Sequence, residues 1–222
     1  MSGVRNPEFA AILDALASEN LPHLRKLGRR ERRAAETRIR LFRNAMRLFA
    51  QRGFQNVTVE DITEAADVGK GTFFNYFQSK EQVLSVMAEI QLGKVRDVLE
   101  QAEAGKQPVR SILRGLFFKV AEEPGRSPEM TRALISTFLA SDEIRANMAG
   151  NLAEGRRMLA RILELGQERK EIAPGLKPEQ MARQCQQAVI ATLLFWSLRG
   201  DEKLETRLEE TFQHFWRAIN LS

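Results

Sequence analysis

The segment 69–82, GKGTFFNYFQSKEQ, combines polar and cationic residues with a dense group of aromatic side chains. If residues 70–77 form two helical turns, one side of the helix carries short, hydrogen-bonding or cationic groups. That outer side holds Lys70, Gly71, Thr72, Asn75 and Tyr76. Thr72 and Asn75 can meet base edges, and Tyr76 can reach a phosphate or a thymine methyl. The segment therefore predicts a surface that reads DNA.

The opposite side of the same helix is aromatic and predicts an attachment to a core. Phe73 and Phe77 are four residues apart, so they share one helical face. Together with Val68 they can pack on apolar residues of the preceding helices, namely Phe42, Phe49 and Ile62. The inner face holds the helix, and the outer face is left for a ligand.

The residues before this helix predict the elements that position it. A helix with an apolar stripe from Ile39 ends at Gly53. Thr58 then fits a helix N-cap with Asp61 in the capping-box position. Three helices therefore occupy 39–77, and the last two are short and joined by about four residues. This is the layout of a helix-turn-helix, whose second helix enters the major groove.

Helix N-termini at Thr58, Lys70 and Ser79 offer amide groups to phosphates, and Lys80 adds a cation. The predicted DNA-binding residues of this region are Thr58, Lys70, Gly71, Thr72, Phe74, Asn75, Tyr76 and Lys80.

The remaining chain also predicts helices. Asn6-Pro7-Glu8 begins a short amphipathic helix over 7–18, and Ser79 with Gln82 forms a capping box for a long helix. Breaks at glycine and proline delimit helices at about 80–103, 108–122, 128–140, 142–171, 178–199 and 201–220. No strand pattern competes, so the predicted fold class is all-α.

The net positive charge lies in the first part of the chain. Residues 1–80 hold 14 Lys and Arg and 9 Asp and Glu, which gives 14 − 9 = +5, whereas 81–222 hold 20 of each. The segment 24–38 is either partly helical or a mobile arm, and its arginines can track phosphates or enter a minor groove. The arginines in question are Arg29, Arg30, Arg32 and Arg33. The alternative is a solvated charged segment.

Catalytic and metal-binding classes find no support in the sequence. The single cysteine, Cys185, cannot form an internal disulfide, and the two histidines are far apart. We find no catalytic triad order, nucleophile elbow or phosphate loop, and therefore expect no enzyme, no cofactor and no metal. No apolar run approaches the ~18 residues of a membrane span, and a reducing cytoplasm is the expected setting.

The segments Thr58–Ile62 and GKGTFFNYFQSKE of 69–81 resemble the N-terminal domain of the TetR family of transcriptional regulators. The resemblance covers about residues 36–85 and is highly specific. Asp67 stands where the family usually has glycine, and Gly69 stands where a capping serine is common. The resemblance implies a homodimer that binds a palindromic operator in double-stranded DNA, most often as a repressor. It also implies a small-molecule effector bound by the C-terminal domain.

These expectations divide the chain into an N-terminal extension over 1–33, a DNA-binding domain over 34–80, and an effector-binding and dimerisation domain over 81–222. The last two helices are the predicted dimer contact, and an internal core pair is the alternative. The predicted contact residues are Met181, Val189, Leu193, Trp196, Leu204, Leu208, Phe212, Phe215 and Ile219.

Methionine and aromatic residues in the C-terminal part could line a pocket for a bulky hydrophobic ligand, although ordinary core packing explains each equally well. The candidate lining residues are Phe117, Phe118, Met130, Leu134, Phe138, Met148, Leu152, Met158, Phe195 and Trp196. A DNA-binding factor that is architectural, or controlled by another protein, is the alternative to a ligand-responsive regulator.

Overall fold

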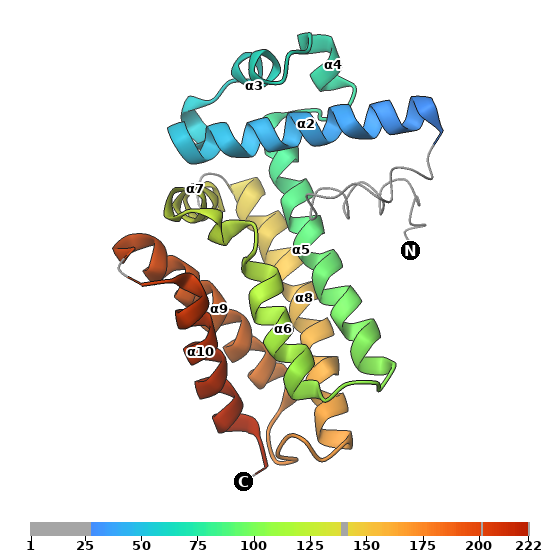
Figure 1. Ribbon diagram of the computed structural model, residues 1–222, viewed down its shortest axis with the longest axis vertical. Helices are drawn as coiled ribbons and strands as arrows, with labels where there is room; N and C mark the ends of the chain where they lie inside the picture. The colour runs from blue at the N-terminus through green and yellow to red at the C-terminus, as the bar shows by residue number, and fades with distance from the viewer. Residues whose placement is uncertain (1–27, 139–141, 201, 222) are drawn as a thin grey trace. The chain divides into compact units, whose positions relative to one another are not determined.

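The computed structural model describes residues 28–138, 142–200 and 202–221, and these residues are helical with short connections (Figure 1). The predicted helix over 7–18 lies outside the described residues. The helices are α2 (Arg29–Arg52), η2 (Phe54–Asn56), α3 (Val59–Ala65), α4 (Lys70–Phe74), α5 (Lys80–Glu103), α6 (Val109–Ala121), η3 (Pro124–Arg126), α7 (Pro128–Phe138), α8 (Asp142–Glu168), α9 (Pro178–Arg199) and α10 (Leu204–Ile219). The all-α prediction is confirmed.

The chain forms two compact units, Met1–Ile90 and Gln91–Ser222, and the division falls within α5. In the N-terminal unit, α3 and α4 lie on one side of α2 (Figure 1). In the C-terminal unit, α9 packs against α8, α10 and α7.

Helix α2 begins ten residues before the predicted Ile39, at Arg29. The Glu31 carboxylate accepts a hydrogen bond from the Gly28 backbone N–H at 2.9 Å and so closes the first turn. The described arginines of the basic segment, from Arg29 onward, therefore belong to a helix. This corrects the alternative in which Arg29 to Arg33 form a mobile arm.

Helix α4 is shorter than the predicted 70–77: it ends at Phe74, and Asn75 and Tyr76 form a turn. The Phe77 backbone N–H still donates to the Phe73 carbonyl at 2.9 Å, so the turn after α4 keeps Phe77 on the same side as Phe73. At the start of α5, the Gln82 side chain accepts from the Gln78 backbone N–H at 2.5 Å. The predicted capping box instead pairs Gln82 with Ser79.

The residues predicted for the dimer contact lie in the core of the C-terminal unit. All nine residues assigned to that contact are buried within the single chain, each with at most 9% of its surface exposed. Phe212, for example, meets Phe117 edge-to-face with ring centroids 5.3 Å apart. The nine residues are Met181, Val189, Leu193, Trp196, Leu204, Leu208, Phe212, Phe215 and Ile219. This burial agrees with the core-pair alternative, and the part of these residues in a dimer contact stays a prediction.

The predicted pocket residues are placed in three different environments. Phe117, Leu134 and Trp196 are buried, and Phe195 is 53% exposed. The remaining six are half-buried: Phe118, Met130, Phe138, Met148, Leu152 and Met158. Trp196 also uses its indole N–H, which donates to the Glu202 carbonyl at 3.1 Å.

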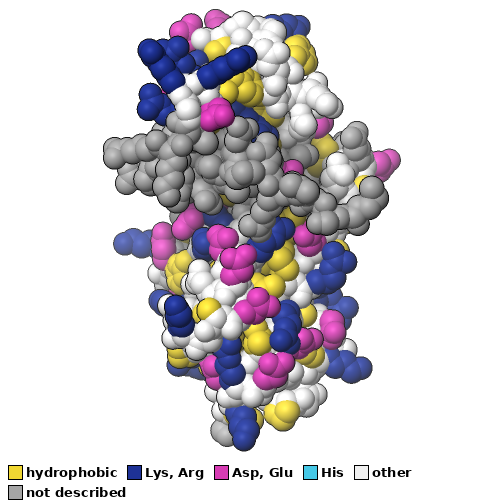
Figure 2. Space-filling view, turned by 90° about the vertical axis from the view of Figure 1, so that its right-hand side faces the viewer, with side chains coloured by type: hydrophobic (Ala, Val, Ile, Leu, Met, Phe, Trp, Pro, Cys, Tyr) yellow, Lys and Arg dark blue, Asp and Glu magenta, His cyan; other side chains and the backbone are white. Residues whose placement is uncertain are grey.

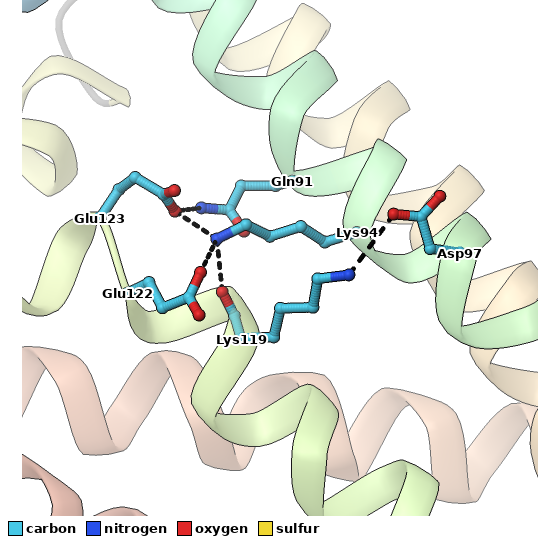
Figure 3. A network of polar contacts seen from close by, with 6 residues as sticks. All are labelled: Gln91, Lys94, Asp97, Lys119, Glu122 and Glu123. Atoms are coloured by element: carbon cyan, nitrogen blue, oxygen red, sulfur yellow. Dashed lines mark hydrogen bonds and ion pairs between the residues drawn. The ribbon is translucent and has the colours of Figure 1, made fainter. Parts of the chain in front are cut away.

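One buried charge ties α5 to the end of α6 in the C-terminal unit. The Lys94 side chain is 3% exposed, and its ammonium contacts the Glu122 carboxylate at 2.9 Å and the Glu123 carboxylate at 2.5 Å (Figure 3). It also donates to the Lys119 carbonyl, one of the last carbonyls of α6. The Glu123 carboxylate accepts a further bond from Gln91. The ammonium is therefore fully paired despite its burial.

We expect Lys94→Ala to destabilise the protein by about 3–5 kcal/mol, because it leaves the Glu123 carboxylate buried without its cation. Urea unfolding measures the change, and Lys106→Ala, at an exposed lysine of the same unit, is the control. A loss of less than about 1 kcal/mol for Lys94→Ala would show that the cluster contributes little to stability.

Candidate nucleic-acid interface

Helix α3 is fixed at its N-terminus by the predicted capping box. The Thr58 hydroxyl accepts from the Asp61 N–H at 3.1 Å, and the Asp61 carboxylate accepts from the Thr58 N–H at 2.8 Å. Arg52, in the last turn of α2, adds an ion pair to Asp61 at 2.9 Å. The hydrogen bonds from Thr58, assisted by Arg52, lower the pKa of Asp61. This network joins the end of α2 to the start of α3.

The turn between α3 and α4 depends on Asp67, which has a φ of +51°. Few residues other than glycine adopt this left-handed conformation, and aspartate is among those that tolerate it. The turn closes with bonds from the Asp67 N–H to Glu64 and from the Val68 N–H to Thr63. Gly69, the N-cap of α4, makes no side-chain capping bond, as its lack of a side chain predicts.

Helix α4 is held by its aromatic inner face. Phe73 is 0% exposed and Phe77 is 1% exposed, and their ring centroids lie 5.5 Å apart. Their predicted burial is confirmed. A helix of five residues has no independent stability, so these two side chains determine how α4 presents its other face.

The outer face of α4 and the following turn is open to solvent. Lys70, Gly71, Phe74 and Asn75 are exposed, whereas Thr72 and Tyr76 are half-buried. A Cβ atom added at Gly71 would meet nothing within 4 Å. A ligand can therefore approach the backbone closely at Gly71.

Two of the predicted cations already have partners within the N-terminal unit. The Lys70 ammonium forms an ion pair with the Glu60 carboxylate of α3, and this hydrogen bond lowers the pKa of Glu60. Lys80 donates to the carbonyls of Phe54 and Val57, both at 3.0 Å, and its ammonium lies 4.5 Å from the Phe54 ring centroid. Lys80 thus holds the connection before α3, a role that the sequence analysis missed.

Helix α2 presents a row of arginines on the side opposite its buried residues. Arg29, Arg32, Arg33, Arg40, Arg43 and Arg47 are spaced by three, one, seven, three and four residues and are all exposed. At 3.6 residues per turn these spacings fall on one stripe. Figure 2 shows Lys and Arg side chains gathered on the surface of this unit. Arg32 also forms an ion pair with Glu36 at 3.6 Å, which partly offsets its charge.

Three further observations on the described residues concern metal binding, thiol chemistry and membrane insertion. They contain no group of three His, Cys, Asp or Glu side chains that could hold a metal ion. Burial raises the pKa of the Cys185 thiol to about 12, so a reactive thiolate is disfavoured. None of the helices in the described ranges is both long and apolar enough to cross a membrane.

Three comparisons relate this arrangement to known proteins. Residues 41–87 match the family model described as bacterial regulatory proteins, tetR family. The HTH-type transcriptional regulator TcmR of Streptomyces glaucescens is 28% identical over 187 residues, which cover 80% of each chain. The HTH-type transcriptional repressor DhaR of Mycobacterium sp. (strain GP1) is 29% identical over 147 residues, covering 64% of this chain and 73% of DhaR.

A solved structure extends the likeness to most of the chain. The crystal structure of Thermus thermophilus FadR, a TetR family transcriptional repressor in complex with lauroyl-CoA, has a TM-score of 0.59 and 28% identity. The match covers 83% of this chain and 96% of the FadR chain. The matched segment 41–87 contains the capped α3, the turn at Asp67 and the aromatic attachment of α4. From its helix-turn-helix and its relatives, the chain belongs to the TetR family of DNA-binding transcriptional regulators.

Proposed function

We propose that this regulator acts as a repressor that binds a palindromic operator as a homodimer and is released by a small hydrophobic ligand. The observation that carries the proposal is the division of α4 into two faces. Phe73 and Phe77 are buried, while Lys70, Gly71, Phe74 and Asn75 are exposed. A helix that is anchored on one side and exposes hydrogen-bonding groups on the other suits insertion into a major groove.

The outer surface of α9 supports the proposal of a homodimer. Ile190, Phe195 and Leu198 are 41%, 53% and 61% exposed, although the opposite side of α9 is packed in the core. A group of large apolar side chains exposed on a helix is normally covered by a partner, and a second copy of the chain would provide that cover. We therefore assign the dimer contact to this face in place of the nine core residues. Two-fold symmetry of the dimer would require a palindromic operator.

Side chains of the C-terminal unit support the proposal that the ligand is hydrophobic. Six half-buried side chains keep part of their apolar surface outside the close-packed core: Phe118, Met130, Phe138, Met148, Leu152 and Met158. Flexible methionine and aromatic side chains adapt to bulky apolar molecules. The related FadR structure contains lauroyl-CoA, so fatty acyl thioesters are the first compounds to test.

The test begins with selection of bound duplexes from a random library, followed by a reporter gene placed behind the selected sequence. We expect a palindromic winner, reduced reporter expression in the presence of the protein, and recovery of expression when an effector is supplied. Binding without any preferred sequence would favour the architectural alternative. A preferred sequence without ligand-dependent release would favour control by another protein.

The ion pair between α3 and α4 predicts opposite effects of two substitutions on operator affinity. Lys70→Ala should weaken binding by about 1–3 kcal/mol, because a cation is lost and Glu60 is left facing the phosphates. Glu60→Gln should strengthen binding, because it removes that carboxylate and releases Lys70. Fluorescence anisotropy on the selected operator measures both. Equal affinity for wild type and the two variants would show that neither residue lies near the DNA.

The N-terminal arginines of α2 predict part of the salt dependence. Replacing Arg29, Arg30, Arg32 and Arg33 with glutamine should reduce the slope of log K against log salt by up to about 0.9 for each lost phosphate contact. The control removes four exposed cations of the C-terminal unit, Lys106, Arg157, Lys177 and Arg217. If the two variants share the wild-type slope, the start of α2 touches no phosphate.

The exposed face of α9 predicts that Leu198→Glu converts the dimer into monomers, because it places a charge in an apolar contact. Sedimentation velocity measures the mass, and circular dichroism verifies that the variant remains helical. Ser136→Glu, at an exposed residue of α7, is the control. A folded Leu198→Glu variant that remains dimeric would place the contact elsewhere.

A further inference from the structure

Phe74 is an unusual residue for the surface that it occupies. It is 48% exposed, and no other large apolar side chain is exposed among the described residues from 28 to 90. The neighbouring exposed positions of α4 carry a cation, a glycine and an amide, at Lys70, Gly71 and Asn75. Water is a poor environment for a phenyl ring, so its presence here suggests an apolar partner.

The ring of Phe74 is held in a fixed place. It meets Phe73 edge-to-face, with ring centroids 5.5 Å apart and an angle of 87° between the planes. Phe73 is itself 0% exposed, so the contact connects Phe74 directly to the core. This support orders the exposed ring before any ligand binds and lowers the entropy cost of binding.

The residues around Phe74 leave space for a close approach. Gly71 lies three residues earlier, on the same side of the helix, and an added Cβ there would meet nothing within 4 Å. Asn75 follows directly and offers an amide that can bond to a base edge. The result is a small apolar spot next to a hydrogen-bonding group.

We propose that Phe74 binds the C5 methyl group of a thymine at one position in each operator half-site and thereby contributes to sequence specificity. The thymine methyl is the apolar group that base pairs display in the major groove, and phenylalanine is among the side chains that contact it. Phosphates and the other base-edge groups are polar and offer a phenyl ring no comparable contact. This assignment rests on the proposed operator binding by α4.

The experiment replaces each thymine of the selected operator, in turn, with deoxyuridine, which removes only the methyl group. For the wild-type protein, we expect a loss of about fourfold per methyl at one position in each half-site, and about fifteenfold when both half-sites are changed. Phe74→Ala should bind more weakly than wild type and show no further loss at that position. Removal of the methyl group and removal of the ring then abolish the same interaction.

Asn75→Ala is the matched variant, because it removes the neighbouring amide and keeps the ring. It should bind more weakly overall but retain the fourfold loss at the same thymine. Equal losses for wild type and Phe74→Ala at every thymine would overturn the inference, as would a wild-type protein that is indifferent to all methyl groups or selects a half-site without thymine. These results leave operator binding by α4 intact, whereas selection of no preferred sequence would reject both proposals.

Discussion

The burial of Phe73 and Phe77 is the interaction on which the N-terminal unit depends. Helix α4 has five residues, too few to be stable alone, and its N-cap is a glycine that provides no side-chain bond. Full burial of a phenylalanine contributes roughly 1.5–3 kcal/mol, which is large compared with any intrinsic preference of so short a helix. The orientation of α4, and hence of Phe74 and Asn75, follows from this aromatic attachment.

Polar contacts around α3 restrict the position of α4 further than the burial of Phe73 and Phe77 does alone. Thr58, Asp61 and Arg52 connect the start of α3 to the end of α2, and Lys80 holds the carbonyls of Phe54 and Val57. None of these groups lies on the outer face of α4. They serve to place α3, whose last turn leads through Asp67 into α4. The surface that we propose for DNA is thus fixed by residues that need not touch DNA themselves.

The helix-turn-helix could be predicted because its signals are local. The capping box at Thr58, the stop at Gly53 and the spacing of Phe73 and Phe77 lie within a few residues of the features they specify. The sequence predicts Lys80 as a cation that binds phosphate. Its carbonyl partners lie 23 and 26 residues away, so no local signal reveals them. Which of the exposed side chains touch DNA stays a prediction.

The last two helices show a different limit. A helical stripe of apolar residues predicts that a face is buried but not which chain covers it. Leu193 and Phe212 are predicted to contact a second subunit, and the structure shows both packed in the core of their own chain. The exposed Phe195 and Leu198 could be distinguished from them only when the path of α9 through the core was known. The polar cluster at Lys94 was likewise invisible, because it joins residues 28 and 29 positions apart.

A crystal structure of the protein with its selected duplex would test the central claim most directly. The account predicts that α4 lies in the major groove with its outer face toward the base edges, and that Phe73 and Phe77 remain buried in the N-terminal unit. A complex in which the arginine stripe of α2 holds the backbone while α4 stays outside the groove would contradict it.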